Sequence, residues 1–234
     1  MMEFDFHCHS KYSFDSTMEP KRIVRLAKSR GLRGMAITDH NSGEGAAEAL
    51  QYQDDGFFII RGMEVTTNAG DIVGLFLSEL KGPSTKDPLE VVKWIHDQGG
   101  LAILAHPFIQ HATIPKGLPE ALDGCEAFNA RYAHLRRGEG AFTHEQIEAF
   151  AREYDLTMVG VSDAHFYGDI AKGRTVIPAQ TPEEVRDALE AGTTAVSGGE
   201  PSPMSGLLSE FLGVAKRLLG GGKGAPPTPP APGV

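Results

Sequence analysis

The chain has 234 residues, of which 41% are hydrophobic and 23% are charged, so it can bury the core of one α/β domain. A net charge of −9 disfavours a protein that tracks along a nucleic-acid backbone, and no apolar run is long enough to span a membrane. Cys8 and Cys125 form no disulfide-scaffold pattern and no signal peptide is recognisable, so we expect reduced thiols in a cytoplasmic protein.

Short apolar runs alternate with amphipathic patterns over residues 1–199. Strands are predicted, in chain order, at EFDFH, GMAITDH, FFIIRGMEVTT, DIVGLFL, LAILAH, GCEAFN, LTMVGVSDAH and TAVSG. Helices are predicted at EPKRIVRLAKSRG, GAAEALQYQDD, DPLEVVKWIHDQGG, THEQIEAFAREY and TPEEVRDALEAG. The turn NAG joins the third and fourth strands into a hairpin. The near-continuous apolar strands are otherwise typical of a parallel sheet covered by helices on both faces, which indicates an α/β barrel domain over residues 1–199.

The composition changes after residue 199. Residues 200–220 carry apolar side chains at helical spacing and predict an amphipathic helix that closes one end of the barrel. Docking of this helix onto a partner protein or a membrane surface is the alternative. Residues 221–234 are rich in Gly and Pro and predict a disordered tail.

The stretch FHCHSKYSFDS, residues 6–16, crowds two histidines and a carboxylate into one short segment. Because residues two apart in an extended strand point the same way, His7 and His9 should share a face while Cys8 packs behind them as a small hydrophobe. Asp15 follows after a turn. These side chains are either ordinary surface groups or metal ligands, and the segment alone does not decide between the two.

Further polar side chains fall at the carboxyl ends of the predicted strands: Asp39, His40, Glu64, His106, Asp163 and His165. In a β/α barrel these ends converge on the face where active sites lie. Four other histidines do not follow this pattern and are expected on the surface or in loops: His96, His111, His134 and His144.

The segments HCHS, SFDS, ITDHN, GMEVTT, AHP and SDAH occur in an order and at spacings that resemble the PHP (polymerase and histidinol phosphatase) family, over roughly residues 1–199. The resemblance implies a distorted (β/α)7 TIM-like barrel with a metal site at the carboxyl ends of its strands. It implies three ligand sets: His7, His9, Glu64 and Asp163; Asp15, His40 and His165; Glu64 and His106. Within these sets Glu64, Asp163 and His165 are expected to be catalytic.

One position departs from the family pattern. Many relatives have a histidine where this chain has Asp71, just before the apolar residues of IVG. Asp71 either contributes an oxygen ligand to the third site, which we favour, or only begins a strand after the turn. We therefore expect two or three divalent ions, and mixed imidazole and carboxylate ligands favour Mn, Zn or Fe.

Four further residues are expected around this site. Asp39 would orient a metal ligand, or would only cap a turn, and Asn129 would ligate a metal weakly or position water. Arg131 would bind a substrate phosphate, although a surface salt bridge is an equal alternative. Lys11 lies in the first loop and would face phosphate, unless it is only solvated.

The resemblance implies a metal-dependent phosphoesterase that hydrolyses a small phosphorylated metabolite or nucleotide with a metal-activated hydroxide. An exonuclease or phosphodiesterase acting on short nucleic acid is an alternative, although the acidic balance and the lack of a basic stripe disfavour long duplexes. A second alternative is a non-catalytic metal-binding PHP module. Amidohydrolases also begin with His-x-His, but they bridge their metals with a modified lysine, where this sequence has Glu64.

Overall fold

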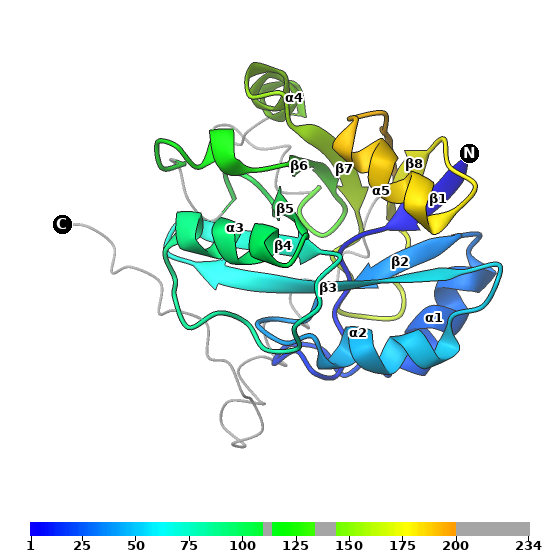
Figure 1. Ribbon diagram of the computed structural model, residues 1–234. Helices are drawn as coiled ribbons and strands as arrows, with labels where there is room; N and C mark the ends of the chain where they lie inside the picture. The colour runs from blue at the N-terminus through cyan, green and yellow to red at the C-terminus, as the bar shows by residue number, and fades with distance from the viewer. Residues whose placement is uncertain (110–113, 134–143, 200–234) are drawn as a thin grey trace.

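The computed structural model describes residues 1–109, 114–133 and 144–199 (Figure 1). The strands are β1 (Met2–Asp5), β2 (Gly34–Ile37), β3 (Phe58–Thr67), β4 (Gly70–Leu75), β5 (Leu101–Leu104), β6 (Gly124–Asn129), β7 (Thr157–Val161), β8 (Gly173–Ile177) and β9 (Ala195–Gly198). The α-helices are α1 (Pro20–Ser29), α2 (Glu44–Ala49), α3 (Pro88–Asp97), α4 (His144–Glu153) and α5 (Pro182–Glu190), and the 3-10 helices are η1 (Leu50–Tyr52) and η2 (Pro119–Ala121). The helices begin where the sequence predicts: Asp87 caps α3 with its side chain and Thr181 caps α5.

The strands form one sheet in the order β7-β6-β5-β4-β3-β2-β1-β8-β9. Pairs β1–β2, β2–β3, β5–β6 and β6–β7 are parallel, whereas β4 and β8 run antiparallel to both of their neighbours. The two ends of the sheet approach each other, because the amide of Gly160 in β7 donates to Oγ1 of Thr175 in β8 at 3.0 Å. The predicted α/β barrel is therefore confirmed as a nearly closed barrel.

The observed sheet differs from the predicted one in strand direction and in strand number. The hairpin of β3 and β4 is present, but the sheet is mixed rather than parallel, and β8 was not predicted at all. The described residues contain nine strands and five α-helices, so the expected seven β/α units are not confirmed.

Three groups of buried apolar residues hold the barrel together. One fills its interior and includes Phe4, Ile60 and Val73 from alternating strand positions. A second packs α3 and α4 against β3 to β6, and a third packs α1 and α2 against β2 and the start of β3 (Figure 1). Cys8 belongs to the third group and Cys125 to the second, and both thiols are buried and free of disulfides.

The carboxyl end of the barrel is closed by the chain that follows β1. Cys8 forms a parallel bridge with Ala164, beyond the end of β7, and the amide of His9 donates to the Ala164 carbonyl at 2.9 Å. On the other side the amide of Thr38 donates to the Cys8 carbonyl at 2.9 Å. This short segment therefore holds the ends of β2 and β7 together, and it places His7 and His9 at their junction.

Some predictions concern other parts of the chain. The helix expected at 200–220 and the tail at 221–234 lie outside the described residues, as do His111 and His134. Within the part that the structure describes, no helix combines the length and apolar character needed to cross a bilayer.

Candidate metal centre

His7 and His9 point to the same place, as the alternation of an extended segment requires. Their Nε2 atoms are 2.9 Å apart, and Oδ1 of Asp163 lies 3.6 Å from Nε2 of His7 and 3.4 Å from Nε2 of His9. Asp163 reaches this position because the chain after β7 turns back toward β1, where its amide donates to the His7 carbonyl at 2.9 Å.

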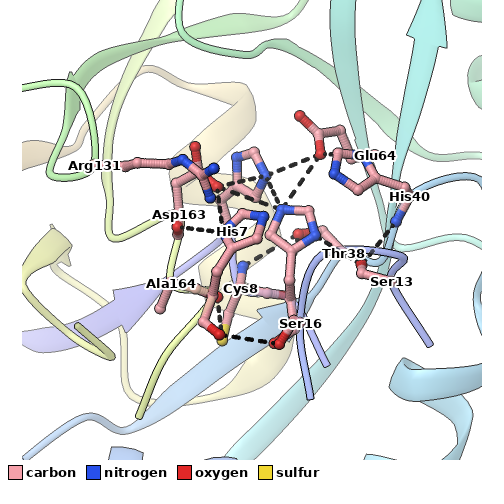
Figure 2. A network of polar contacts seen from close by, with 12 residues as sticks. His7, Cys8, Ser13, Ser16, Thr38, His40, Glu64, Arg131, Asp163 and Ala164 are labelled. Carbon is pink, nitrogen blue, oxygen red and sulfur yellow. Dashed lines mark hydrogen bonds and ion pairs between the residues drawn. The ribbon is translucent and has the colours of Figure 1, made fainter. Parts of the chain in front are cut away.

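Glu64 stands at the middle of the cluster. It lies near the carboxyl end of β3, and His40 bridges to it from the end of β2. Its Oε2 is 2.9 Å from Nδ1 of His40, 3.3 Å from Nε2 of His9 and 3.4 Å from Nε2 of His7. Its Oε1 is 3.2 Å from Nε2 of His106, which follows β5. Figure 2 shows Glu64 and His40 approaching the region of His7 from the side opposite Asp163.

The candidate ligand atoms form three overlapping groups, and within each group they lie within 4.8 Å of one another. The groups are His9, Asp15, His40 and His165; His7, His9 and Glu64; Glu64, Asp71 and His106. His9 and Glu64 each belong to two groups, so either could serve neighbouring ions. The structure thus brings together all nine residues expected as ligands, including Asp71, whose Oδ2 is 3.7 Å from Nε2 of His106.

The hydrogen-bonding state of these atoms fits metal binding. Glu64 Oε2, His40 Nδ1 and His165 Nε2 are buried and make no hydrogen bond, although an imidazole nitrogen or a carboxylate oxygen lies close to each. Buried polar atoms are almost always hydrogen-bonded. Nitrogen and oxygen atoms that face one another without forming a hydrogen bond could instead share a bound cation. Imidazole nitrogens with carboxylate oxygens are the donor set of Mn, Zn and Fe.

Electrostatics in the metal-free fold point the same way. Burial raises the pKa of Glu64, but the imidazoles of His40 and His7 outweigh it and hold this pKa well below its usual value. Burial, together with His165 and His40, lowers the pKa of His9 to about 3, so this imidazole is neutral and can ligate. Buried carboxylates held ionised beside crowded imidazoles form a site that attracts cations.

The backbone is strained at two of these positions. His106 has a φ of 28° and Asp163 a φ of 50°, a left-handed region that side chains other than glycine rarely adopt. Such conformations cost roughly 1–3 kcal/mol each and persist where the surrounding structure requires them. Here they turn His106 and Asp163 from the ends of β5 and β7 toward Glu64 and His7.

A carboxylate that the sequence reading missed supports the ligands from behind. Glu126, in β6, accepts a hydrogen bond from Nδ1 of His7 at 2.6 Å through Oε1. Its Oε2 accepts from the amide of His106 at 2.7 Å and from Nδ2 of Asn129 at 2.8 Å. Asn129 also donates to Oδ2 of Asp163 at 3.1 Å, so it contacts both Glu126 and a candidate ligand. The available signal was an acidic residue inside an otherwise apolar strand.

Asp39 supports the other side of the cluster through two serines that were also missed. Its Oδ1 accepts from Oγ of Ser13 at 2.8 Å, and Ser13 Oγ lies 2.9 Å from Nδ1 of His9. Its Oδ2 accepts from Oγ of Ser10 at 2.6 Å. Asp39 therefore contacts His9 indirectly through Ser13, and its role in orienting a metal ligand stays a prediction.

The two cations predicted to contact substrate differ in position. Arg131 lines a small cavity with Asp163 and His165, so it lies at the cluster. Nζ of Lys11 instead lies 2.9 Å from Glu19 and 3.0 Å from Glu48, and these ion pairs hold it away from the ligands. Its role in phosphate binding stays a prediction. The remaining described histidines, His96 and His144, lie on helices outside the cluster, as expected.

Comparison with known proteins agrees with this geometry. A family model described as PHP domain matches residues 5–199. An uncharacterized protein of Methanocaldococcus jannaschii is 39% identical over 145 residues, which are 55% of this chain and 82% of the relative. A Haemophilus influenzae protein named 5′-3′ exoribonuclease is 29% identical over 130 residues, 53% of this chain and 44% of that protein.

A solved structure shares the fold. It is a two-domain protein from Bacteroides vulgatus described as containing a predicted PHP-like metal-dependent phosphoesterase. It superposes with a TM-score of 0.71 at 20% identity, covering 90% of this chain and 69% of that one. Because the family model covers residues 5–199, most of the chain, the protein belongs to the PHP domain family.

Proposed function

We propose that the protein is a metal-dependent phosphoesterase whose substrate is a small phosphorylated metabolite or a nucleotide. The observation that carries the proposal is the position of Glu64, whose two carboxylate oxygens each lie within 3.4 Å of imidazole nitrogens from different strand ends. A carboxylate with this environment suits adjacent cations better than one isolated cation. Divalent ions bound there would lower the pKa of water and neutralise phosphoryl oxygens.

The side chains of the protein would bind the ions, orient the ligands and bind the substrate phosphate. The three groups of ligands described above would hold two or three ions, with Glu64 and His9 between them. Glu126 and Asp39 would keep the imidazoles of His7 and His9 in one orientation. Arg131, beside Asp163, would bind the substrate phosphate through its planar guanidinium.

A second candidate is hydrolysis of a phosphodiester in short nucleic acid. The exoribonuclease name of one relative favours it, although the aligned region covers only 44% of that protein. The chemistry at the metal cluster would be the same, and the substrates would differ in what lies beyond the reacting phosphate.

The test is metal quantification followed by assays of phosphorylated metabolites, nucleotides and short oligonucleotides with Mn²⁺ and with Zn²⁺. The wild type should hydrolyse at least one phosphate ester, and Asp163→Asn should lose that activity. Asp97→Asn is the matched control, because Asp97 is an exposed acid on α3 paired with Lys93. Tight metal binding by a wild type that hydrolyses no phosphate ester would instead favour the non-catalytic module.

A further inference from the structure

Helix α1 carries an unusual charge for this chain. Residues 20–33 contain six basic residues and no acidic residue, although the whole chain has a net charge of −9. The six are Lys21, Arg22, Arg25, Lys28, Arg30 and Arg33. The chain is acidic overall, but the segment around α1 is basic. The expectation that the chain lacks a basic stripe is therefore wrong for this segment.

Four of these basic residues line a groove between α1 and α2, which lie side by side (Figure 1). The groove has a volume of about 580 Å³ and is lined by Lys21, Arg22, Val24, Arg25, Lys28 and Tyr52, together with Glu19 and Glu48. Lys11 lies within 3.0 Å of both Glu19 and Glu48, so it partly offsets their charge. Among the described residues no carboxylate forms an ion pair with Lys21, Arg22 or Arg25, and all three are exposed.

Aromatic rings accompany the charges. The Tyr52 ring faces Nζ of Lys21 at 5.9 Å, and the Tyr167 ring faces the guanidinium of Arg22 at 4.0 Å. Both tyrosine residues are partly exposed. Cationic side chains with accessible rings are what proteins use to hold the phosphates and bases of single strands.

The groove and the metal cluster are connected through neighbouring segments of the chain. Pro20, the first residue of α1, comes five positions after Asp15, and Tyr167 comes two positions after His165. The hydroxyl of Tyr167 accepts a hydrogen bond from the amide of Glu19 at 2.8 Å, which ties these two segments together. A chain bound along α1 would therefore arrive at the cluster from this side. The ten residues of α1 extend about 15 Å, enough for about four phosphates at the spacing of a stacked strand.

We propose that the groove between α1 and α2 binds single-stranded nucleic acid and directs its terminal phosphate to the metal cluster. This inference rests on the phosphoesterase function proposed above and selects its second candidate, a phosphodiester in short single-stranded nucleic acid, over a small metabolite. An anionic membrane fits the surface less well, because the apolar residues of α1 are buried against the sheet and cannot insert into lipid. Duplex nucleic acid fits less well because stacking on a tyrosine requires an unpaired base.

The test compares a long and a short substrate in one charge-reversal variant. Lys21→Glu combined with Arg25→Glu should lower kcat/KM for a single-stranded RNA of about 12 nucleotides at least tenfold. Turnover of a mononucleotide should remain unchanged. The dependence of log kcat/KM on log salt concentration should also become shallower, by about 0.7 for each phosphate that the variant no longer neutralises.

Lys93→Glu combined with Arg152→Glu is the matched control, because it makes the same charge change on exposed positions of α3 and α4. The proposal would be wrong if the two double variants changed kcat/KM for the RNA equally, or if neither changed it. Loss of binding to phosphatidylglycerol vesicles by the α1 variant, with unchanged RNA turnover, would also contradict the proposal.

If the wild type hydrolyses no phosphate ester, the proposed function fails. Fluorescence anisotropy of the same RNA then measures RNA binding by the groove independently of activity. In that case, weaker RNA binding by the α1 variant alone supports RNA binding in the groove. Equal binding by the wild type, the α1 variant and the control variant contradicts it.

Discussion

Nδ1 of His7 lies 2.6 Å from Oε1 of Glu126, and both side chains are buried. With Glu126 as the acceptor, this contact holds a proton on Nδ1, so a neutral His7 imidazole would direct its Nε2 lone pair at the cluster. The second oxygen of Glu126 holds the amide of His106, and therefore one carboxylate orients two candidate ligands on different strands. In metal sites the loss of such a supporting contact typically lowers metal affinity or activity about 10-fold to 100-fold.

Glu126→Gln should weaken metal binding about 10-fold to 100-fold while the fold is retained. The amide of glutamine cannot accept from both His7 and His106, so the preferred ring orientation is lost. Isothermal titration with Mn²⁺ measures the affinity, and activity should recover at saturating metal. Glu120→Gln is the matched control, because Glu120 is exposed outside the cluster. Equal Mn²⁺ affinity in the two variants would remove the positioning role.

His9→Ala should lower turnover by on the order of 100-fold or more and loosen bound metal. The reason is that His9 belongs to two of the three ligand groups, so one substitution removes a donor from both. Activity and metal content per chain are the measurements. His96→Ala, on the exposed side of α3, should change neither. A His9→Ala protein with normal activity and metal content would show that the ligand assignment is wrong.

Arg131→Ala should raise KM for phosphate monoesters more than it lowers kcat, since Arg131 lines the cavity beside Asp163 without belonging to a ligand group. A bidentate guanidinium would contribute to binding of both the substrate and the transition state. Arg131→Lys should restore only part of the loss, because an ammonium cannot contact two oxygens in the same planar geometry. An unchanged KM in Arg131→Ala would assign this residue a purely structural role.

Much of this arrangement follows from the sequence, because polar residues at successive strand ends are informative once a barrel is inferred. His40, Glu64 and Asp163 are far apart in the chain, and only closure of the sheet brings them together. Strand β8 was predictable in retrospect, because Thr175, Val176 and Ile177 form a β-branched run between Gly173 and Pro178. Glu126 and the two serines escaped prediction because a supporting hydrogen bond depends on side-chain distances that spacing does not encode. The basic residues of α1 can be read from the sequence, but the prediction considered only the net charge of the whole chain.

Gly45→Ala should destabilise the protein by about 1–3 kcal/mol and also weaken metal binding. A Cβ atom at this buried position on α2 would overlap Oδ2 of Asp39 and Oγ of Ser10. Asp39 would have to move, and the hydrogen bonds that lead through Ser13 to His9 would move with it. Chemical denaturation and metal titration measure the two effects. Gly168→Ala is the control, because a Cβ there meets no atom within 4 Å. Loss of stability without loss of metal affinity would separate Asp39 from the metal cluster.

Stabilisation by added metal should increase with pH. In the metal-free fold burial lowers the pKa of His106, but the hydrogen bond and the charge of Glu64 raise it to about 8, above its ordinary value of 6.5. The protonated imidazole therefore stabilises the metal-free fold fully below pH 6.5, and this contribution is lost as the pH rises through 8.

A bound cation requires the neutral imidazole, so protons compete with metal in the same pH range. The rise in Tm on adding Mn²⁺ should be small near about pH 6 and clearly larger near about pH 8.5, with protons released on binding. Differential scanning fluorimetry at several pH values measures the first effect, and titration in buffers of different ionisation enthalpy measures the second. His106→Ala should flatten the pH dependence, whereas His144→Ala should leave it unchanged because His144 lies on α4 outside the cluster. Equal Tm increments at both pH values in the wild type would contradict a cation held by His106 and Glu64.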